Sequence, residues 1–524
     1  MKKLLGAVGI MLVLVMVLTG CAGKDPAQTA APSKSDTAGA DAPGQTGDGR
    51  TDIVIGMAGE PVSVEPQSAY DAAGSKVVCN VYDGLVDVDD DNNIIANLAK
   101  DWDISDDGLV YTFHLRDDIR FHNGDPLTAE DFVYSIEKAI ELGYGEETTG
   151  VIDHVEATGE HTLDVTLKHP YKPMMQNFAH SKYLYVVNSK LAKEAGDNFA
   201  INPVGAGTGP YKFVSWTSGV NVKLEANEDY HRGAPAIKEA TFKFIPEQSS
   251  GAIALETGDV DVYTDLSFVD VPKLMEKDDI QVDVTLGRYA YYLCMNQTKE
   301  MFQDIRVRQA LAYSINMDEF ILAVLNGIGG TKTGNVVFPD TFGYAEGYPP
   351  FEQNVEEAKR LLAEAGYPDG ISFTILATDG LRKVSAETLQ GMMAKSGIDV
   401  KIDLLDFSAM VDKQVTDQHD VIIMNSSAPI EDADSELTDK IMSGKWGNFS
   451  RYANPVVDDL MVQARMELDD AKRADLYAQI QEILRTELPI VPMYYAHVAS
   501  GANANLKGFR AWGSTYIFLR GMSW

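Results

Sequence analysis

The sequence predicts an α/β fold, because segments with the two-residue alternation of strands are interleaved with segments of helical periodicity. The clearest helix starts after Thr128, which can cap it, and two acidic residues stand in its positive first turn. Further along, residues 371–376, 385–395 and 399–404 have the patterns of a strand, a helix and a strand. This is the order of a β-α-β unit in an α/β lobe.

The other elements are predicted in the same way. Alternating apolar residues indicate strands at residues 51–56, 111–116 and 161–167. One-sided apolar stripes and capping residues indicate helices at 129–140, 250–257, 305–315, 354–366 and 470–488. Gly366 can end one of these helices as a left-handed cap, and Pro489 stops the last.

The first residues have the order of a secretory signal. Lys2 and Lys3 precede an apolar run at residues 4–18, which is short for a membrane-spanning helix. The tetrapeptide Leu18-Thr19-Gly20-Cys21 resembles the bacterial lipobox. That resemblance implies that residues 1–20 are removed and that Cys21 carries a lipid. A membrane anchor ending in an incidental cysteine is the alternative, and both place the body of the protein outside the cytoplasm.

Residues 21–50 are predicted to be a disordered tether. They consist almost entirely of Ala, Gly, Pro, Ser, Thr, Asp and Gln, and they show no apolar period. Such a segment cannot bury enough surface to fold. Folding is therefore expected to begin at about residue 51.

Composition indicates a globular body that is not embedded in a membrane. Apolar residues make up 45% of the chain and charged residues 23%, which are ordinary values for globular domains. The net charge of −34 argues against a nucleic-acid or anionic-lipid partner. With Cys21 lipidated, only Cys79 and Cys294 remain, and their spacing suits neither a zinc site nor a disulfide framework. Two structural thiols are expected, with a disulfide between them as the open alternative.

Local signatures of catalysis are absent from the sequence. It contains no G-x-S-x-G elbow, no H-E-x-x-H helix and no G-x-x-x-x-G-K-[ST] phosphate loop. The glycine-rich stretch at 205–210 is no dinucleotide loop, because Pro210 replaces its last glycine and a strand follows. His122 and His419 are interpreted as surface or core histidines, with a ligand contact as the alternative. The chain is therefore predicted not to be an enzyme, and no cofactor or metal is assigned.

Long blocks of the sequence resemble those of one protein family. The most specific block covers residues 98–131. The others, in the family's order, are Gly207-Thr208-Gly209-Pro210-Tyr211, Gly258-Asp259-Val260-Asp261, 304–311, 363–367, 451–458 and 488–492. The family that these blocks resemble is the dipeptide, oligopeptide and nickel class of solute-binding proteins that serve ABC importers, known as family 5.

The resemblance covers about residues 52–510 and implies a two-lobed, periplasmic-binding-protein-like fold of class II type. The first lobe would span 51–287, with an inserted subdomain at about 85–200. The second lobe would span 288–494, and residues 495–524 would return to the first. Two crossover segments, near 286–292 and 494–500, would join the lobes as hinges.

The resemblance also implies a function. We expect a receptor, tethered to the outer face of the cytoplasmic membrane by its lipid alone, that captures a small solute between two lobes. It would act as a monomer and deliver a peptide or peptide-like solute to an ABC permease and ATPase complex. A nickel or other metal chelate is the alternative solute. A surface sensor or adhesin, or a secreted hydrolase, is the alternative from another class.

Candidate solute contacts follow from the same resemblance. In peptide-binding members an aspartate of the second lobe pairs the ammonium group of the peptide, and here Asp432 stands at that position, beside Glu431 and Asp434. Pro429 and Glu431 depart from the family pattern, which leaves the solute open. The alternative is an acidic loop that is merely solvated.

Aromatic side chains are further candidates. Tyr70, Tyr289 and Tyr291 are predicted to contact the solute, because tyrosines near the crossover and in the loop after the first strand could cover an apolar group or an arginine. Core packing is the alternative for each. Arg306 and Arg308 are expected to make structural ion pairs, with attraction of a ligand carboxylate as the alternative.

Overall fold

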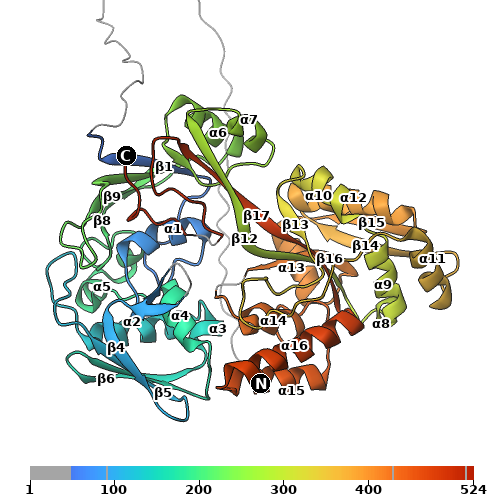
Figure 1. The fold of residues 1–524 in the computed structure, drawn as a ribbon, viewed down its shortest axis with the longest axis horizontal. Coiled ribbons are helices and arrows are strands. Elements are labelled where there is room, and N and C mark those ends of the chain that lie inside the picture. The colour runs from blue at the N-terminus through green and yellow to red at the C-terminus, as the bar shows by residue number, and fades with distance from the viewer. Residues whose placement is uncertain (1–48, 90–92, 428–429, 514–515) are drawn as a thin grey trace, which may run out of the picture. The chain divides into compact units, whose positions relative to one another are not determined.

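A large mixed sheet organises the chain. The computed structural model describes residues 49–89, 93–427, 430–513 and 516–524. The strands of this sheet are β1 (Asp52–Met57), β8 (Tyr211–Thr217), β9 (Asn221–Ala226), β10 (Glu239–Phe244), β11 (Val262–Tyr263), β12 (Ile280–Met295), β13 (Gly330–Lys332), β14 (Ile371–Ala377), β15 (Ile398–Leu404), β16 (Val421–Ser427) and β17 (Ile490–Asn503). Their order is β15-β14-β16-β12-β17-β11-β1-β10-β9-β8, and β13 adds to β17 (Figure 1).

The end of the sheet around β1 forms the first lobe. Here β1 pairs in parallel with β10 and β11, and β9 and β8 continue the sheet as antiparallel strands. Its helices are α1 (Ala72–Val81), α5 (Ser189–Ala195), α6 (Gln248–Thr257) and α7 (Val271–Met275), with a 3₁₀ turn at Gly196–Ala200. The core of this lobe includes Ile55, Phe242 and Val262 from the sheet and Leu519 from the C-terminal segment. The last residues therefore pack back into the first lobe.

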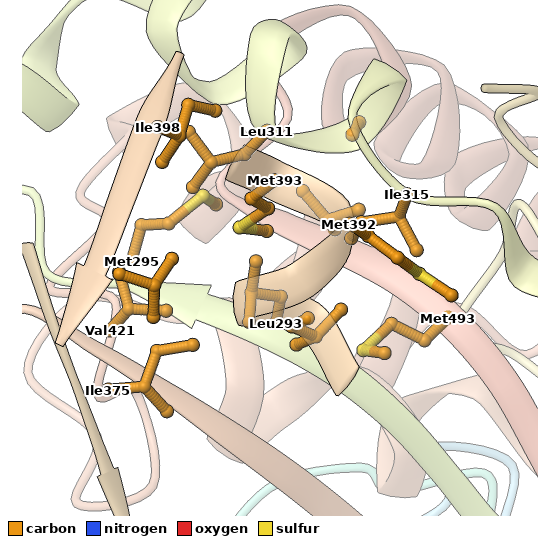
Figure 2. Packing of buried hydrophobic residues seen from close by; sticks show 14 of the residues in the cluster. Leu293, Met295, Leu311, Ile315, Ile375, Met392, Met393, Ile398, Val421 and Met493 are labelled. Atoms are coloured by element: carbon orange, nitrogen blue, oxygen red, sulfur yellow. The ribbon is translucent and has the colours of Figure 1, made fainter. Parts of the chain in front are cut away.

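The end of the sheet around β14 belongs to the second lobe. Strand β14 pairs in parallel with both β15 and β16, and α12 (Leu381–Ala394) connects β14 to β15, so the predicted β-α-β unit is confirmed. Met392 and Met393 of this helix belong to the same buried cluster as Leu293, Ile375 and Val421 of the sheet, and Figure 2 shows Met393 above Leu293 and Met392 beside Ile315. The remaining helices are α8 (Glu300–Gln303), α9 (Ile305–Tyr313), α10 (Met317–Leu325), α11 (Val355–Glu364), α13 (Phe407–Val415), α14 (Ala433–Ile441), α15 (Pro455–Met466) and α16 (Asp470–Glu487).

Two long strands join the lobes. Strand β12 pairs with β16 of the second lobe, β17 pairs with β11 of the first, and the two pair with each other along most of their length. Their ladder is interrupted between the pairs Leu286–His497 and Ala290–Tyr495, so that three residues of β12 lie opposite one residue of β17. This bulge places Arg288 and Tyr289 where the chain passes from one lobe to the other.

A smaller layer of strands is attached to the first lobe. Its sheet has the order β4-β5-β7-β6, and a hairpin of two further strands lies beside it. The elements are β2 (Val86–Val88), β3 (Ile94–Ala96), β4 (Ala99–Ile104), β5 (Val110–Leu115), α2 (Ala129–Leu142), α3 (Glu146–Thr149), β6 (Ile152–Gly159), β7 (Thr162–Leu167), α4 (Met174–His180) and a 3₁₀ turn at Lys182–Leu184. They share a core of their own, which includes Phe113, Phe132 and Phe178.

Local sequence signals explain several of these boundaries. Thr128 caps α2 in a reciprocal capping box with Asp131, as its position predicted, and the side chain of Asn354 accepts from the backbone of Glu357 at the start of α11. Gly366 has φ 96°, in the left-handed region expected after that helix. Ile140, in the last turn of α2, is 39% exposed, whereas Phe132 and Ile136 of the same helix are buried.

The turn at 207–211 needs glycine for close packing. A Cβ atom on Gly209 would lie 2.7 Å from the carbonyl oxygen of Val81, which is closer than non-bonded atoms approach. The backbone of Gly209 can therefore donate to that same carbonyl at 2.9 Å. This contact ties the start of β8 to the end of α1.

Candidate functional site

A hollow lies at the carboxyl ends of the parallel strands in the first lobe. It has a volume of about 650 Å³, and its lining comes from the segments that follow β1 and β10 and from a loop after β11: Ala58, Pro246, Glu247, Gln248, Ser249, Ser267, Val269 and Asp270. Open α/β sheets bind ligands in the crevice outside the carboxyl ends of their strands. The hollow is therefore the first part of the candidate site.

A partly buried ion pair borders this hollow. The Nζ atom of Lys76 lies 2.8 Å from Oδ1 of Asp265, and the backbone nitrogen of Ala58 donates to Oδ2 of the same carboxylate at 2.9 Å. Burial disfavours the charged form of Asp265, but Lys76 and the hydrogen bonds outweigh it and hold the pKa of this carboxyl below its ordinary value. Asp265 is thus a fixed negative charge, partly neutralised by Lys76.

Tyr289 and Tyr291 lie on one face of β12, as expected for residues two apart on a strand. Burial raises the pKa of Tyr289, and the nearby charge of Asp265 adds to the effect. The ring of Tyr291 stacks on that of Tyr494 of β17, with centroids 4.6 Å apart and an angle of 7° between the planes. We call these three tyrosines the aromatic strip; they lie on the paired strands β12 and β17, and Tyr494 belongs to the core of the second lobe.

Arg382 lies at the second-lobe end of this strip. It belongs to the first turn of α12, just after β14, and its positive charge acts against the pKa rise that burial causes at Tyr291 and Tyr494. Its Nη2 atom makes one long contact, 3.4 Å, to Oδ1 of Asn425 at the end of β16. Among the described residues, no carboxylate forms an ion pair with this half-buried guanidinium.

The sequence prediction did not include Arg382. Its position just after a predicted strand, two residues beyond Gly380, was a signal that could have marked it as a candidate for solute binding. Without the structure, however, such an arginine cannot be told from one paired with a carboxylate elsewhere in the chain.

The acidic segment at 431–436 is paired internally. Asp432 caps α14, and both of its oxygens are held by Arg473, at 2.6 and 2.7 Å. Asp432 and Asp434 are each only 3% exposed, so these two carboxylates do not form a solvated loop. An ammonium group could reach Asp432 only by competing with Arg473. Its role as a solute anchor stays a prediction.

Glu431 and Asp434 meet different partners. Glu431 forms an ion pair with Arg288 at the bulge of β12, and Arg288 also bonds Asp340 and Thr341. Asp434 pairs with Arg465 at 2.6 Å and accepts from the hydroxyl of Tyr171 at 3.1 Å. Both carboxylates therefore lie near the junction of the lobes, and both are bound by side chains of the protein itself.

Other predicted residues lie elsewhere. Tyr70 is 52% exposed, and its ring lies 5.0 Å from that of Tyr144, so the structure does not bring it to the aromatic strip. Arg306 makes the expected ion pair with Asp304, whereas Arg308 donates to backbone carbonyls, including those of Phe302 and Leu488. Arg308 differs from expectation because it donates to carbonyls at the ends of α8 and α16 instead of pairing with a carboxylate.

The histidines and cysteines are structural. His122 contacts the carbonyl of Gly209, and His419 contacts that of Phe449. Cys79 and Cys294 are both free and buried, which excludes a disulfide between them. Within the described ranges, no group of three or more His, Cys, Asp or Glu side chains is arranged to hold a metal ion.

Several expectations fall outside the described residues. These are the signal segment, almost all of the tether, the lipidation site Cys21, and Pro429. Among the helices in the described part of the chain, none has the length and apolar character required to cross a membrane.

The chain belongs to the bacterial extracellular solute-binding proteins of family 5. The family model, described as "Bacterial extracellular solute-binding proteins, family 5 Middle", matches residues 93–447. The proteins of this family are extracytoplasmic receptors of ABC importers that bind peptides or related solutes, and they are not enzymes.

Named relatives agree along nearly the whole chain. The glutathione-binding protein GsiB of Pectobacterium atrosepticum is 28% identical over 474 residues, which are 87% of this chain and 91% of GsiB. The oligopeptide-binding protein AppA of Bacillus subtilis is 27% identical, over 97% of this chain and 96% of AppA.

Solved structures have the same fold. The binding protein DppA of Helicobacter pylori, in complex with the peptide STSA, is 29% identical with a TM-score of 0.77, over 90% of this chain and 97% of DppA. HbpA2 of Haemophilus parasuis is 26% identical with a TM-score of 0.81, over 90% of this chain and 99% of that protein. The predicted two-lobed periplasmic-binding-protein fold is therefore confirmed.

Proposed function

We propose that this protein captures a peptide or peptide-like solute that carries a carboxylate, and that Arg382 binds this carboxylate. The observation that carries the proposal is the guanidinium of Arg382, which lies beside two tyrosines without an ion-pair partner among the described residues. A buried or half-buried cation is costly unless a negative group pairs with it. Arginine also presents the planar, two-pronged donor geometry that suits a carboxylate.

The other end of the solute would face the hollow of the first lobe. Glu247 and Asp270 line this hollow, and Asp265 lies at its border. Their negative charges favour a cationic group such as an ammonium. A zwitterion lying along β12 would thus place its carboxylate at Arg382 and its ammonium near the acidic side chains. The tyrosines between them would cover the middle of the solute.

This assignment explains how solute binding can close the protein. Arg382 belongs to the second lobe and the hollow belongs to the first, so a solute touches both sets of residues only when the lobes approach each other. The solute then binds the closed arrangement better than the open one and increases its population. The importer can distinguish the loaded receptor by this shape.

The printed names of the relatives support a peptide-like solute. GsiB is named for glutathione, AppA for oligopeptides, and the DppA structure holds a peptide. All three kinds of ligand carry carboxylates and an amino group. We further propose that Cys21 carries a lipid, so that the tether keeps the receptor near its importer.

The solute should be identified directly. The protein is purified under mild conditions, and any retained small molecule is released by denaturation and identified by mass spectrometry, together with metal analysis. A peptide-like compound with a carboxylate supports the proposal. A metal chelate without a free carboxylate, or chemical turnover of the retained compound, contradicts it. Mass spectrometry of the intact chain from the membrane fraction tests the lipid, because an unmodified Cys21 contradicts the anchor.

A further inference from the structure

One residue of the second lobe makes a buried contact with the first. The hydroxyl of Tyr171, which follows β7 in the smaller layer of strands, donates to Oδ2 of Asp434 at 3.1 Å. Tyr171 is 4% exposed and Asp434 is 3% exposed. Burial, with a contribution from Asp434, raises the pKa of Tyr171 well above its ordinary value, so the hydroxyl keeps its proton and remains a donor.

The second lobe holds the other oxygen of the same carboxylate. Nε of Arg465 on α15 lies 2.6 Å from Oδ1 of Asp434, and the Nη2 atom of this arginine contacts Thr438 on α14. One oxygen is therefore bound within the second lobe, and the other is bound by the first. Of these two contacts to Asp434, separation of the lobes would break the one from Tyr171 and leave the one from Arg465.

Neighbouring contacts cross between the lobes at the same place. The backbone nitrogen of Lys172 donates to the carbonyl of Arg465 at 3.3 Å. The Nζ atom of Lys172 lies 3.4 Å from both the carbonyl of Leu468 and Oδ1 of Asp470. Leu468 also packs on Gly108, where an added Cβ would lie 3.2 Å from Cδ2 of this leucine. The two surfaces therefore fit each other over several residues.

We propose that Tyr171, Lys172, Asp434, Arg465 and Leu468 form a closure latch, which stabilises the closed arrangement of the lobes whatever the solute. The polar side chains of the latch have partners within the protein, so none of them requires a solute. Asp434 then contributes to affinity by favouring closure rather than by contacting the solute. The latch would raise the closed population before binding and slow the release of a bound solute.

The latch can be tested without knowing the solute. Spin labels are placed at Glu137→Cys on α2 and Glu387→Cys on α12, two exposed positions on different lobes, in the full-length chain carrying Cys21→Ala. Cys79 and Cys294 are buried and stay unlabelled. Pulsed electron–electron double resonance on solute-free protein then gives the populations of short and long distances between the two labels. We expect Tyr171→Phe to lower the closed-to-open ratio about tenfold, as the loss of a hydrogen bond to a charged acceptor predicts.

Tyr111→Phe is the matched control. Its hydroxyl donates to the carbonyl of Tyr171 at 3.4 Å, so the substitution also removes a buried tyrosine hydroxyl but leaves the contact between lobes intact. The control should keep the parent distance distribution. The latch is refuted if Tyr171→Phe leaves the distribution unchanged, or if both variants shift it equally. Since no solute is present, a wrong assignment of Arg382 affects neither result.

Discussion

Arg473 donates hydrogen bonds to both carboxylate oxygens of Asp432. The pair is buried in the second lobe, where the two side chains are 2% and 4% exposed. Arg473 also donates to the hydroxyl of Tyr477 and lies over the ring of Phe342. The pair fastens the start of α14 to α16. An acidic residue that family resemblance places at the solute therefore has a complete set of structural contacts.

The first prediction concerns this pair. Asp432→Ala leaves the guanidinium of Arg473 buried without its partner, so we expect the free energy of unfolding to fall by about 3 to 5 kcal/mol. Urea unfolding measures the change. Asp118→Ala is the control, because Asp118 makes a similar two-pronged pair with Arg116 on the surface, where the loss should stay below about 1 kcal/mol. Unchanged stability of Asp432→Ala, with a large loss of solute affinity, would instead favour the ammonium-anchor role.

The second prediction concerns Arg382. Arg382→Gln keeps a polar side chain but removes the charge, and we expect solute binding to weaken by about 2 to 5 kcal/mol because the solute carboxylate loses its partner. Isothermal titration with the identified solute measures the loss. Arg360→Gln is the control, since Arg360 is exposed on α11 and pairs with Glu357 and Glu364. Equal affinities of Arg382→Gln and the parent protein would remove Arg382 from the site.

The third prediction concerns the pH dependence of stability. Asp83 is buried and accepts hydrogen bonds from Tyr230 and Thr208, and burial raises its pKa from 3.8 to about 6. The folded state therefore binds a proton more tightly than the unfolded state, and this contribution to stability is lost as the pH rises from about 4 through 6.

The variant Asp83→Asn should lack this dependence. Relative to it, the parent protein should lose roughly 2 to 3 kcal/mol of stability between pH 4 and pH 7, as the size of the pKa rise implies. Unfolding curves in urea at several pH values measure the difference. Asp117→Asn, at an exposed position, should show the same change of stability with pH as the parent protein. A constant difference between Asp83→Asn and the parent over this range would contradict the prediction.

The fourth prediction concerns the thiols. Burial raises the pKa of Cys79 to about 12 and that of Cys294 well above its ordinary value, so neither forms a thiolate near neutral pH. In a Cys21→Ala background, a thiol reagent should react with neither cysteine in the native protein. After unfolding it should react with both. The absorbance of the released chromophore counts them. Rapid reaction of either thiol in the native state would mean that its surroundings open.

Local signals made much of the fold predictable. Thr128 and Asp131 lie three residues apart, and the strand, helix and strand between 371 and 404 follow directly along the chain, so their patterns are readable without tertiary information. The identity of the family followed from long blocks of similar sequence, and most of those blocks are scaffold.

The candidate site was less predictable because its chemistry depends on pairing between distant residues. Asp432 and Arg473 are 41 positions apart, and Tyr171 and Asp434 are 263 apart. The sequence places carboxylates together at 431–436, but it does not reveal that each of them pairs with a different arginine or lysine side chain. For the same reason it could not single out Arg382, whose distinction is the absence of such a partner among the described residues.

The two strands that join the lobes have a mechanical consequence. Because β12 and β17 stay paired on both sides of the bulge at 287–289, we expect the lobes to swing without breaking the ladder, with the bending concentrated where pairing is already interrupted. The two paired strands would then act as a flexible hinge, and the angle between the lobes would depend little on forming new backbone hydrogen bonds. Small differences in side-chain contact at the rim can therefore tip the balance between open and closed.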